Sequence, residues 1–114
     1  MRDDGERLRD ILEAIERIER HQAQGREAFS TSELVQTWIV HHLQIIGEAA
    51  RKLSDGLRKR HPEIPWPEIV AMRNVLVHDY FTVDLEEVWA AVEQDLPELK
   101  RKIEAVLKDL EESV

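Results

Sequence analysis

The sequence predicts an all-α fold, an up-and-down bundle of four to five helices that forms a single domain over residues 1–114. Apolar residues recur at helical spacing along most of the chain. Glycine and proline number only four each, which is too few for the many turns of a sheet-rich fold. Charged residues make up 35% of the chain, but the apolar residues are frequent and periodic, which argues against a disordered chain.

The first helix is predicted over residues 2–24. Its apolar residues follow the spacing of one buried stripe, and charged residues fill the other faces. Gly25 is expected to end the helix. The predicted stripe consists of Leu8, Ile11, Leu12, Ile15 and Ile18.

A long second helix is predicted over residues 30–54. Ser30 and Glu33 have the spacing of a capping box, in which the serine caps the first turn of the helix. A broad apolar face then continues to Leu53. Near the end of this helix lie small residues that allow another backbone to approach closely, namely Gly47, Ala49 and Ala50.

The segment 55–61 is predicted to be a short, polar and basic connection. Three of the four prolines follow within residues 61–67, and proline disfavours helical geometry at the residue before it, so this segment is predicted to be a rigid loop. Pro67 suits the first turn of the next helix, which is predicted over residues 67–77. The segment 78–82 is expected to form the end of that helix and a turn.

A second capping box, from Asp84 to Glu87, predicts the start of the last helix. This helix carries an apolar stripe as far as Leu110. Pro97 lies inside it and lacks the N–H that an α-helix requires. We therefore expect the last helix to be kinked or split at this proline.

The overall charge and the residue types that are missing limit the possible functions. Sixteen basic and 24 acidic residues give a net charge of −8, which argues weakly against a protein that binds nucleic acid through its bulk charge. The sequence has no cysteine, so disulfides, zinc–thiolate sites and cysteine nucleophiles are excluded. No apolar run approaches the roughly 20 residues that span a bilayer, and the chain opens with charged residues, so we expect a cytoplasmic protein without a membrane partner.

The chemically informative segment carries a guanidinium, an amide, an imidazole, a carboxylate and a phenol within eight residues. Arginine suits the binding of a phosphate, and histidine exchanges a proton near neutral pH. Together they suit cleavage of an RNA phosphodiester without a metal ion or another cofactor, with the asparagine orienting the arginine or the phosphate. The residues concerned are Arg73, Asn74, His78, Asp79 and Tyr80.

The spacing of this motif sets a geometric condition. On a regular helix, Arg73 and His78 are about 140° apart around the axis and do not share a face. They converge only if the helix ends between them or if two copies of the segment meet across a two-fold axis. A working site therefore predicts a homodimer. Taken alone, an arginine and a histidine at a helix end are more often a C-terminal cap and a surface contact than a catalytic pair.

The remaining histidines do not suggest a metal site. His41 and His42 are adjacent, so they point about 100° apart on a helix, whereas a metal pair favours positions i and i+4. We therefore predict that the protein has no metal ligands.

The same segment resembles a known family. Arg73-x4-His78-x-Tyr80 matches the R-x4-H-x-Y motif of the HepT-like toxins of the HEPN superfamily. The similarity spans nearly the whole chain, in order and at a typical length. The other matching blocks are Ile45–Ala50, Ile64–Trp66, Met72–His78, Val88–Trp89 and Leu96–Pro97.

This resemblance implies a helical bundle that dimerises, with Arg73 and His78 forming an endoribonuclease site in a cleft at the dimer interface and Asn74 assisting. It implies a toxin–antitoxin system in which an MntA-type nucleotidyltransferase is the antitoxin and silences the toxin by transferring AMP to Tyr80. It implies transfer RNA or messenger RNA as the target. The alternative is a catalytically inactive HEPN subunit that binds the nucleotidyltransferase and presents its substrate.

Several further residues have candidate supporting roles. Glu48 is placed to hydrogen-bond the motif arginine from the neighbouring helix, or it is an ordinary surface carboxylate. Asp79 is a possible supporting residue or a solvated turn residue. Five basic residues around the single acidic Asp55 have a local net charge of +4, and they either contact the RNA backbone or form a solvated helix end. These are Arg51, Lys52, Arg58, Lys59 and Arg60.

Overall fold

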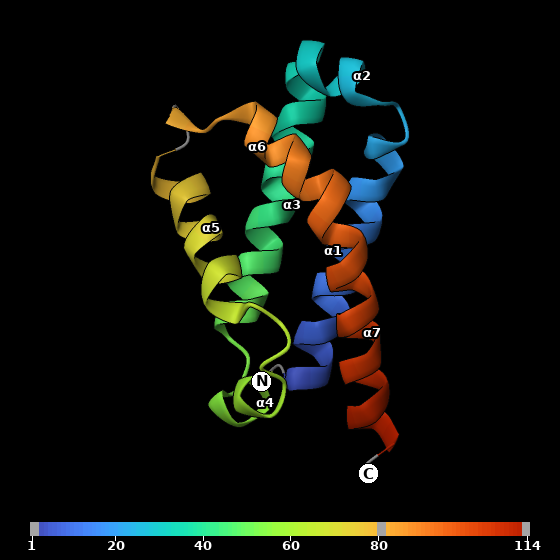
Figure 1. Cartoon of the computed structure of the whole chain (residues 1–114), viewed down its shortest axis with the longest axis vertical. Coiled ribbons are helices and arrows are strands. Elements are labelled where there is room, and N and C mark those ends of the chain that lie inside the picture. The colour runs from blue at the N-terminus through green and yellow to red at the C-terminus, as the bar shows by residue number, and fades with distance from the viewer. Residues whose placement is uncertain (1–2, 80–81, 113–114) are drawn as a thin grey trace.

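The computed structural model describes residues 3–79 and 82–112, and within these ranges the chain is helical without any strand. The predicted all-α class is therefore confirmed. The elements in chain order are α1 Asp4–Gln22, α2 Arg26–Thr31, α3 Glu33–Arg51, α4 Asp55–Arg60, α5 Trp66–His78, α6 Leu85–Ala90, the π-helical segment η2 Ala91–Asp95 and α7 Leu96–Glu112 (Figure 1).

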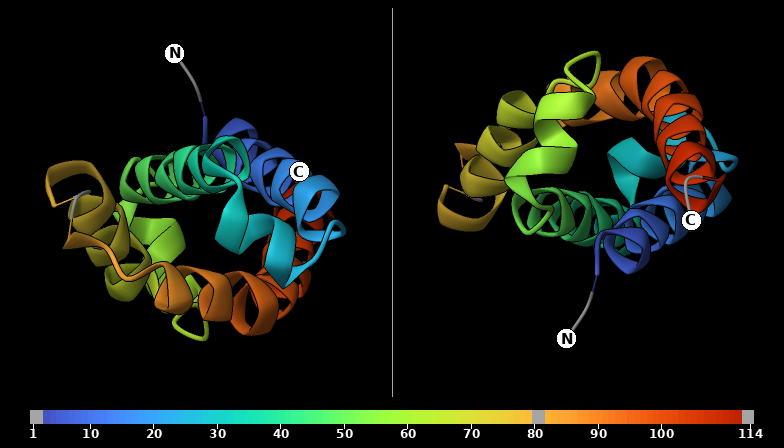
Figure 2. Two further views of the ribbon diagram at one scale, coloured as in Figure 1. Left: turned by 90° about the horizontal axis from the view of Figure 1, so that it is seen from above. Right: turned by 90° about the horizontal axis from the view of Figure 1, so that it is seen from below.

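The central helix of the bundle is α3. It packs against α1 on one side and against α5 on the other, while α1 also packs against α7. The views along the bundle show α5 at its outer edge (Figure 2). The predicted stripe on the first helix is confirmed, because four of its five residues are buried and Leu12 is partly buried. One side of α5 therefore faces away from the bundle.

The start of the second long helix differs from the prediction. Residues 30 and 31 belong to a separate short helix, α2, and the cap of α3 is Ser32, whose hydroxyl accepts a hydrogen bond from the N–H of Val35. Phe29 is buried in the core, which holds the short helix against the bundle. Gly25 precedes α2 with φ of 95°, a left-handed conformation that favours glycine.

The segment predicted as a polar connection is also a helix, α4. Its cap is Ser54, which accepts a hydrogen bond from the N–H of Leu57, and Leu57 is fully buried. Ser54 in turn donates to the carboxylate of Asp4 through its N–H at 2.9 Å and its hydroxyl at 2.6 Å. The structure therefore has four principal helical regions, as predicted, plus two six-residue helices that the pattern of the sequence did not reveal.

The last helix is split, as predicted from Pro97. The α-helical segment α6 starts after Asp84, whose side chain accepts a hydrogen bond from the N–H of Glu86. The chain then widens into the π-helical turn Ala91–Asp95 before α7 begins. Because proline donates no hydrogen bond to the preceding turn, a local π geometry there is physically reasonable. No helix in the described parts of the chain is both long enough and apolar enough to cross a membrane.

Candidate functional site

Helix α5 carries the motif residues without a break. It begins at Trp66, with Pro67 in its first turn, and it ends at His78, one residue beyond the predicted bounds at each end. Arg73 and His78 therefore lie on one continuous helix, separated by about 140° around the axis and about 7.5 Å along it. Within a single chain the two side chains diverge, and the helix does not end between them.

A close approach of α5 to α3 places Arg73 against the middle of the bundle. A Cβ atom added to Gly47 would lie 2.2 Å from the Cβ and 2.8 Å from the Cγ of Arg73. Any larger residue at position 47 would collide with the stem of Arg73. The small residue on the second long helix thus has the predicted role of admitting a neighbouring helix.

The guanidinium of Arg73 is held by two side chains. Its Nη2 pairs with Oε2 of Glu48 at 3.1 Å, and its Nη1 donates to Oδ1 of Asn74 at 3.1 Å. The arginine side chain is 23% exposed, so it is largely covered but still partly accessible to solvent. Of the two alternatives given for Glu48, this ion pair agrees with the contact to the motif arginine from the neighbouring helix.

Glu48 also binds two cations on its own helix. Arg51 lies 2.7 Å from Oε1 of Glu48, and Lys52 lies 3.2 Å from the same oxygen. The hydrogen bonds from Arg51 and Lys52, together with the charge of Arg73, lower the pKa of Glu48 from 4.5 to about 2. The carboxylate is therefore ionised at neutral pH.

The other motif residues lie on the open side of α5. Asn74 and His78 are exposed to solvent. Two apolar side chains beside them are exposed as well, Val75 at 48% and Val77 at 40%. Asp79 is also exposed; its N–H donates to the carbonyl of Val75 and its own carbonyl accepts from Thr82. These contacts fit its alternative interpretation as a turn residue. Tyr80 lies outside the described residues.

The five basic residues make different contacts. Arg51 and Lys52 surround Glu48, next to the motif arginine. Arg58 pairs with Asp55 at 2.6 Å and lines, with Lys59, a hollow of about 580 Å³ whose other walls include Ile64 and Trp66. Arg60 is exposed at the end of α4.

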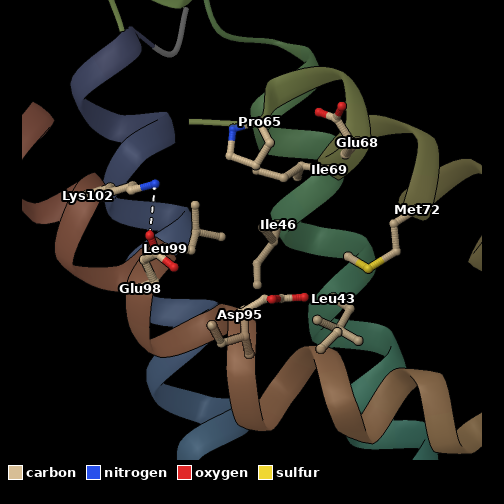
Figure 3. A pocket seen from close by; sticks show the side chains of 12 residues that line it. Leu43, Ile46, Pro65, Glu68, Ile69, Met72, Asp95, Glu98, Leu99 and Lys102 are labelled. Carbon is tan, nitrogen blue, oxygen red and sulfur yellow. Dashed lines mark ion pairs between the residues drawn. The ribbon is translucent and has the colours of Figure 1, made fainter. Parts of the chain in front are cut away.

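A second depression of about 210 Å³ lies between α3, α5 and α7 (Figure 3). Apolar side chains such as Ile46, Ile69 and Leu99 form its floor, and the ion pair between Lys102 and Glu98 lies at its rim. None of the predicted site residues lines this depression. The described residues of the motif thus lie outside this depression.

One residue near the motif was not predicted from the sequence. Gln44 on α3 donates from Nε2 to the carbonyl oxygen of Leu76 at 3.1 Å and so supports the last turn of α5, where His78 lies. Gln44 could have been found from its position four residues before Glu48, because residues at i and i+4 lie on the same face of a helix. Both side chains contact α5. Among the described residues, no group of three or more potential metal-binding side chains is present.

A helical bundle with an Arg-x4-His pair on an outer helix is the arrangement expected of a HEPN-type domain. The model of the family described as Ribonuclease HepT-like matches residues 11–106. The chain belongs to this HepT-like family, as the motif resemblance implied.

Curated relatives agree with this assignment. The chain is 41% identical over 102 residues to a protein of Thermococcus cleftensis named "Probable ribonuclease HepT", covering 89% of this chain and 93% of that protein. It is 36% identical over 100 residues to a "Putative RNase" of Methanocaldococcus jannaschii, covering 87% of this chain and 92% of the relative. No solved structure gave a significant match.

Proposed function

We propose that this protein is an endoribonuclease that acts without a metal ion, and that each site combines Arg73 of one copy with His78 of a second copy. The observation that carries the proposal is the divergence of the two side chains on one continuous α5, which also exposes Val75 and Val77. Membership of the HepT-like family and the names of its relatives support the reaction class.

The side chains that α5 leaves uncovered support a homodimer. Val75 and Val77 are exposed next to Asn74 and His78, although apolar side chains gain free energy when they leave water. A two-fold contact between α5 helices would cover these side chains and bring each motif beside its twin. The apolar surface would also exclude water from the reacting groups.

The chemistry assigns one task to each side chain. The imidazole of His78 takes the proton of the RNA 2′-hydroxyl, and that oxygen attacks the adjacent phosphorus. Arg73 stabilises the charge that builds on the phosphoryl oxygens. The bond from phosphorus to the 5′-oxygen breaks, that oxygen takes a proton from water, and the imidazolium of His78 gives its proton to the hydroxide ion that remains. The products carry a 2′,3′-cyclic phosphate and a 5′-hydroxyl.

The direct test is incubation of the purified protein with total RNA in excess EDTA, followed by mapping of the new ends. Wild type is expected to cleave and His78→Ala to lose at least 100-fold in rate, the typical contribution of general acid–base catalysis. Cleavage that survives His78→Ala, or that requires a divalent metal, contradicts the proposal. A folded, dimeric wild type that binds a nucleotidyltransferase but leaves RNA intact would favour the inactive-subunit alternative.

We further propose that the enzyme is the toxin of a toxin–antitoxin pair in the cytoplasm and that it acts on transfer RNA or messenger RNA. Its partner would be an MntA-type nucleotidyltransferase, which transfers AMP to Tyr80. Each AMP adds a phosphodiester charge and a bulky base two residues from His78, which would repel the RNA phosphate.

Intact mass spectrometry after coexpression with such a partner tests the modification. We expect added AMP masses on wild type and none on Tyr80→Phe. An added mass that persists in Tyr80→Phe would exclude this residue as the acceptor. The number of AMP units is read from the same spectrum.

A further inference from the structure

Glu48 is the centre of a charge cluster that joins α3 to the motif. One carboxylate lies within 3.2 Å of three cations, with Arg51 and Lys52 on its own helix and Arg73 on α5. Its side chain is 30% exposed, less than those of Arg51 and Lys52. The cluster retains a net charge of +2, so it still attracts an anion after Glu48 has been neutralised.

We propose that Glu48 is a positioning residue for the ribonuclease reaction, which orients the guanidinium of Arg73 toward the scissile phosphate, and that Arg51 and Lys52 hold the Glu48 carboxylate in place. The inference rests on the proposed ribonuclease function. It assigns Arg51 and Lys52 a task in addition to any contact with the RNA backbone.

The geometry at Arg73 supports this role. Glu48 binds Nη2 and Asn74 binds Nη1, each at 3.1 Å, so two different nitrogens of the planar group are fixed by side chains from two helices. A guanidinium has five N–H groups, and these two contacts leave enough donors for a bidentate grip on a phosphate. Holding the plane beforehand removes rotamer freedom that RNA binding would otherwise have to remove.

The surroundings keep Glu48 itself from moving. Arg51 approaches the carboxylate with two nitrogens, Nη2 at 2.7 Å and Nε at 3.3 Å, and Lys52 adds a third contact. Gly47, the adjacent residue, keeps α3 in direct contact with the stem of Arg73. Glu48 is therefore held by Arg51 and Lys52, and the stem of Arg73 is held against α3 at Gly47.

A competing role for Glu48 makes the opposite prediction. If the carboxylate only occupied the place of a phosphate on Arg73, its removal would strengthen RNA binding and would leave turnover unchanged or faster. If it positions Arg73, its removal lowers turnover, while the added positive charge leaves KM unchanged or lower. The sign of the change in kcat therefore separates the two roles.

The experiment compares steady-state RNA cleavage by wild type, Glu48→Gln and the matched control Glu19→Gln. Glu19 also makes an ion pair between helices, with Lys100 of α7 at 2.9 Å and 40% exposure, but it does not contact α5 through that pair. We expect Glu48→Gln to lose about tenfold in kcat without a rise in KM, as for the loss of a hydrogen bond to a charged group. Glu19→Gln should stay within twofold of wild type.

A fall in kcat of less than fivefold for Glu48→Gln, or an equal fall in Glu19→Gln, overturns the inference. If Glu48→Gln fails to fold by circular dichroism, Glu48→Asp replaces it, because aspartate keeps the charge but is shorter by about one C–C bond, ~1.5 Å. The same thresholds then apply. If wild type itself does not cleave RNA, the proposed function fails first and the inference falls with it.

The order of the Arg73 side chain can also be measured by NMR, independently of RNA cleavage. The side-chain Nε–H signal of Arg73, observed by ¹⁵N relaxation, is expected to report an ordered group in wild type and a mobile one in Glu48→Gln. The Arg73 signal should remain ordered in Glu19→Gln. An arginine that is equally ordered in all three proteins would show that Glu48 does not hold it.

Discussion

Substitution of Gly47 by alanine tests the contact that places Arg73 on α3. The new Cβ would lie 2.2 Å from the Cβ of Arg73 and 3.2 Å from the backbone oxygen of Ile69. Carbon atoms pack at about 3.5–4.0 Å, so α5 would have to withdraw locally by at least about 1.3 Å. Such a shift would stretch the contact between Arg73 and Glu48, which is 3.1 Å long in the structure.

The magnitude follows from two opposing terms. Overpacking of a tight contact costs about 3 kcal/mol at the upper end of its usual range. Alanine recovers about 1 kcal/mol over glycine through its helix propensity. The expected net loss is about 2 kcal/mol, or a fall of about 8 °C in Tm for a chain of this length.

The assay is thermal and urea unfolding of Gly47→Ala beside the matched variant Gly56→Ala. Gly56 lies in α4, and an added Cβ there would meet only the movable Nη1 of Arg60 at 3.4 Å, so alanine should be neutral or stabilising. We also expect Gly47→Ala to lower RNA cleavage more than Gly56→Ala. A Gly47→Ala protein as stable as wild type would refute the close approach of α5 to α3.

Three further outcomes follow from single contacts. Gln44→Ala removes the bond to the carbonyl of Leu76 and should lower the unfolding free energy by about 1 kcal/mol in urea titrations; no loss would contradict that support for α5. Burial, together with the positive charge of nearby residues, lowers the pKa of His42 below its ordinary value of 6.5, so the free energy of unfolding should fall as the pH drops below 6.5. Calorimetry at pH 7 and pH 5 should show a weaker pH dependence for His42→Gln than for wild type. An unchanged pH dependence in the variant would contradict this. Trp89→Phe deletes a buried indole N–H that has no partner among the described residues, so only the cavity left by the smaller ring should cost stability. We expect the unfolding free energy to fall by less than about 2 kcal/mol, and a larger loss would contradict this.

The long helices could be predicted from sequence because their signals are local. The stripe from Leu8 to Ile18 and the proline in the last helix are read from spacing alone, and both predictions were confirmed. The short helices α2 and α4 were missed because six residues are too few for a periodic pattern, and their stability comes from tertiary burial of Phe29 and Leu57. The sequence predicted Ser30 as the cap of the second long helix, but residues 30 and 31 belong to the short helix α2, and Ser32 caps α3.

The site was predictable in part. The residue types of the motif and the small Gly47 are local features, so their importance is visible in the sequence. The partners of Glu48 depend on where α5 crosses α3, which no spacing along one helix determines. For that reason the sequence predicted Arg51 and Lys52 either as RNA contacts or as part of a solvated helix end, and their contacts with Glu48 became visible only in the folded chain.

The central claim is that Arg73 of one copy acts with His78 of another. The most direct measurement mixes two inactive variants, Arg73→Ala and His78→Ala, after subunit exchange, and records RNA cleavage in EDTA. With random exchange, half of the dimers are mixed and each has one intact site of two, so about a quarter of wild-type activity should return. A mixture that stays as inactive as its components would contradict a site shared between two copies.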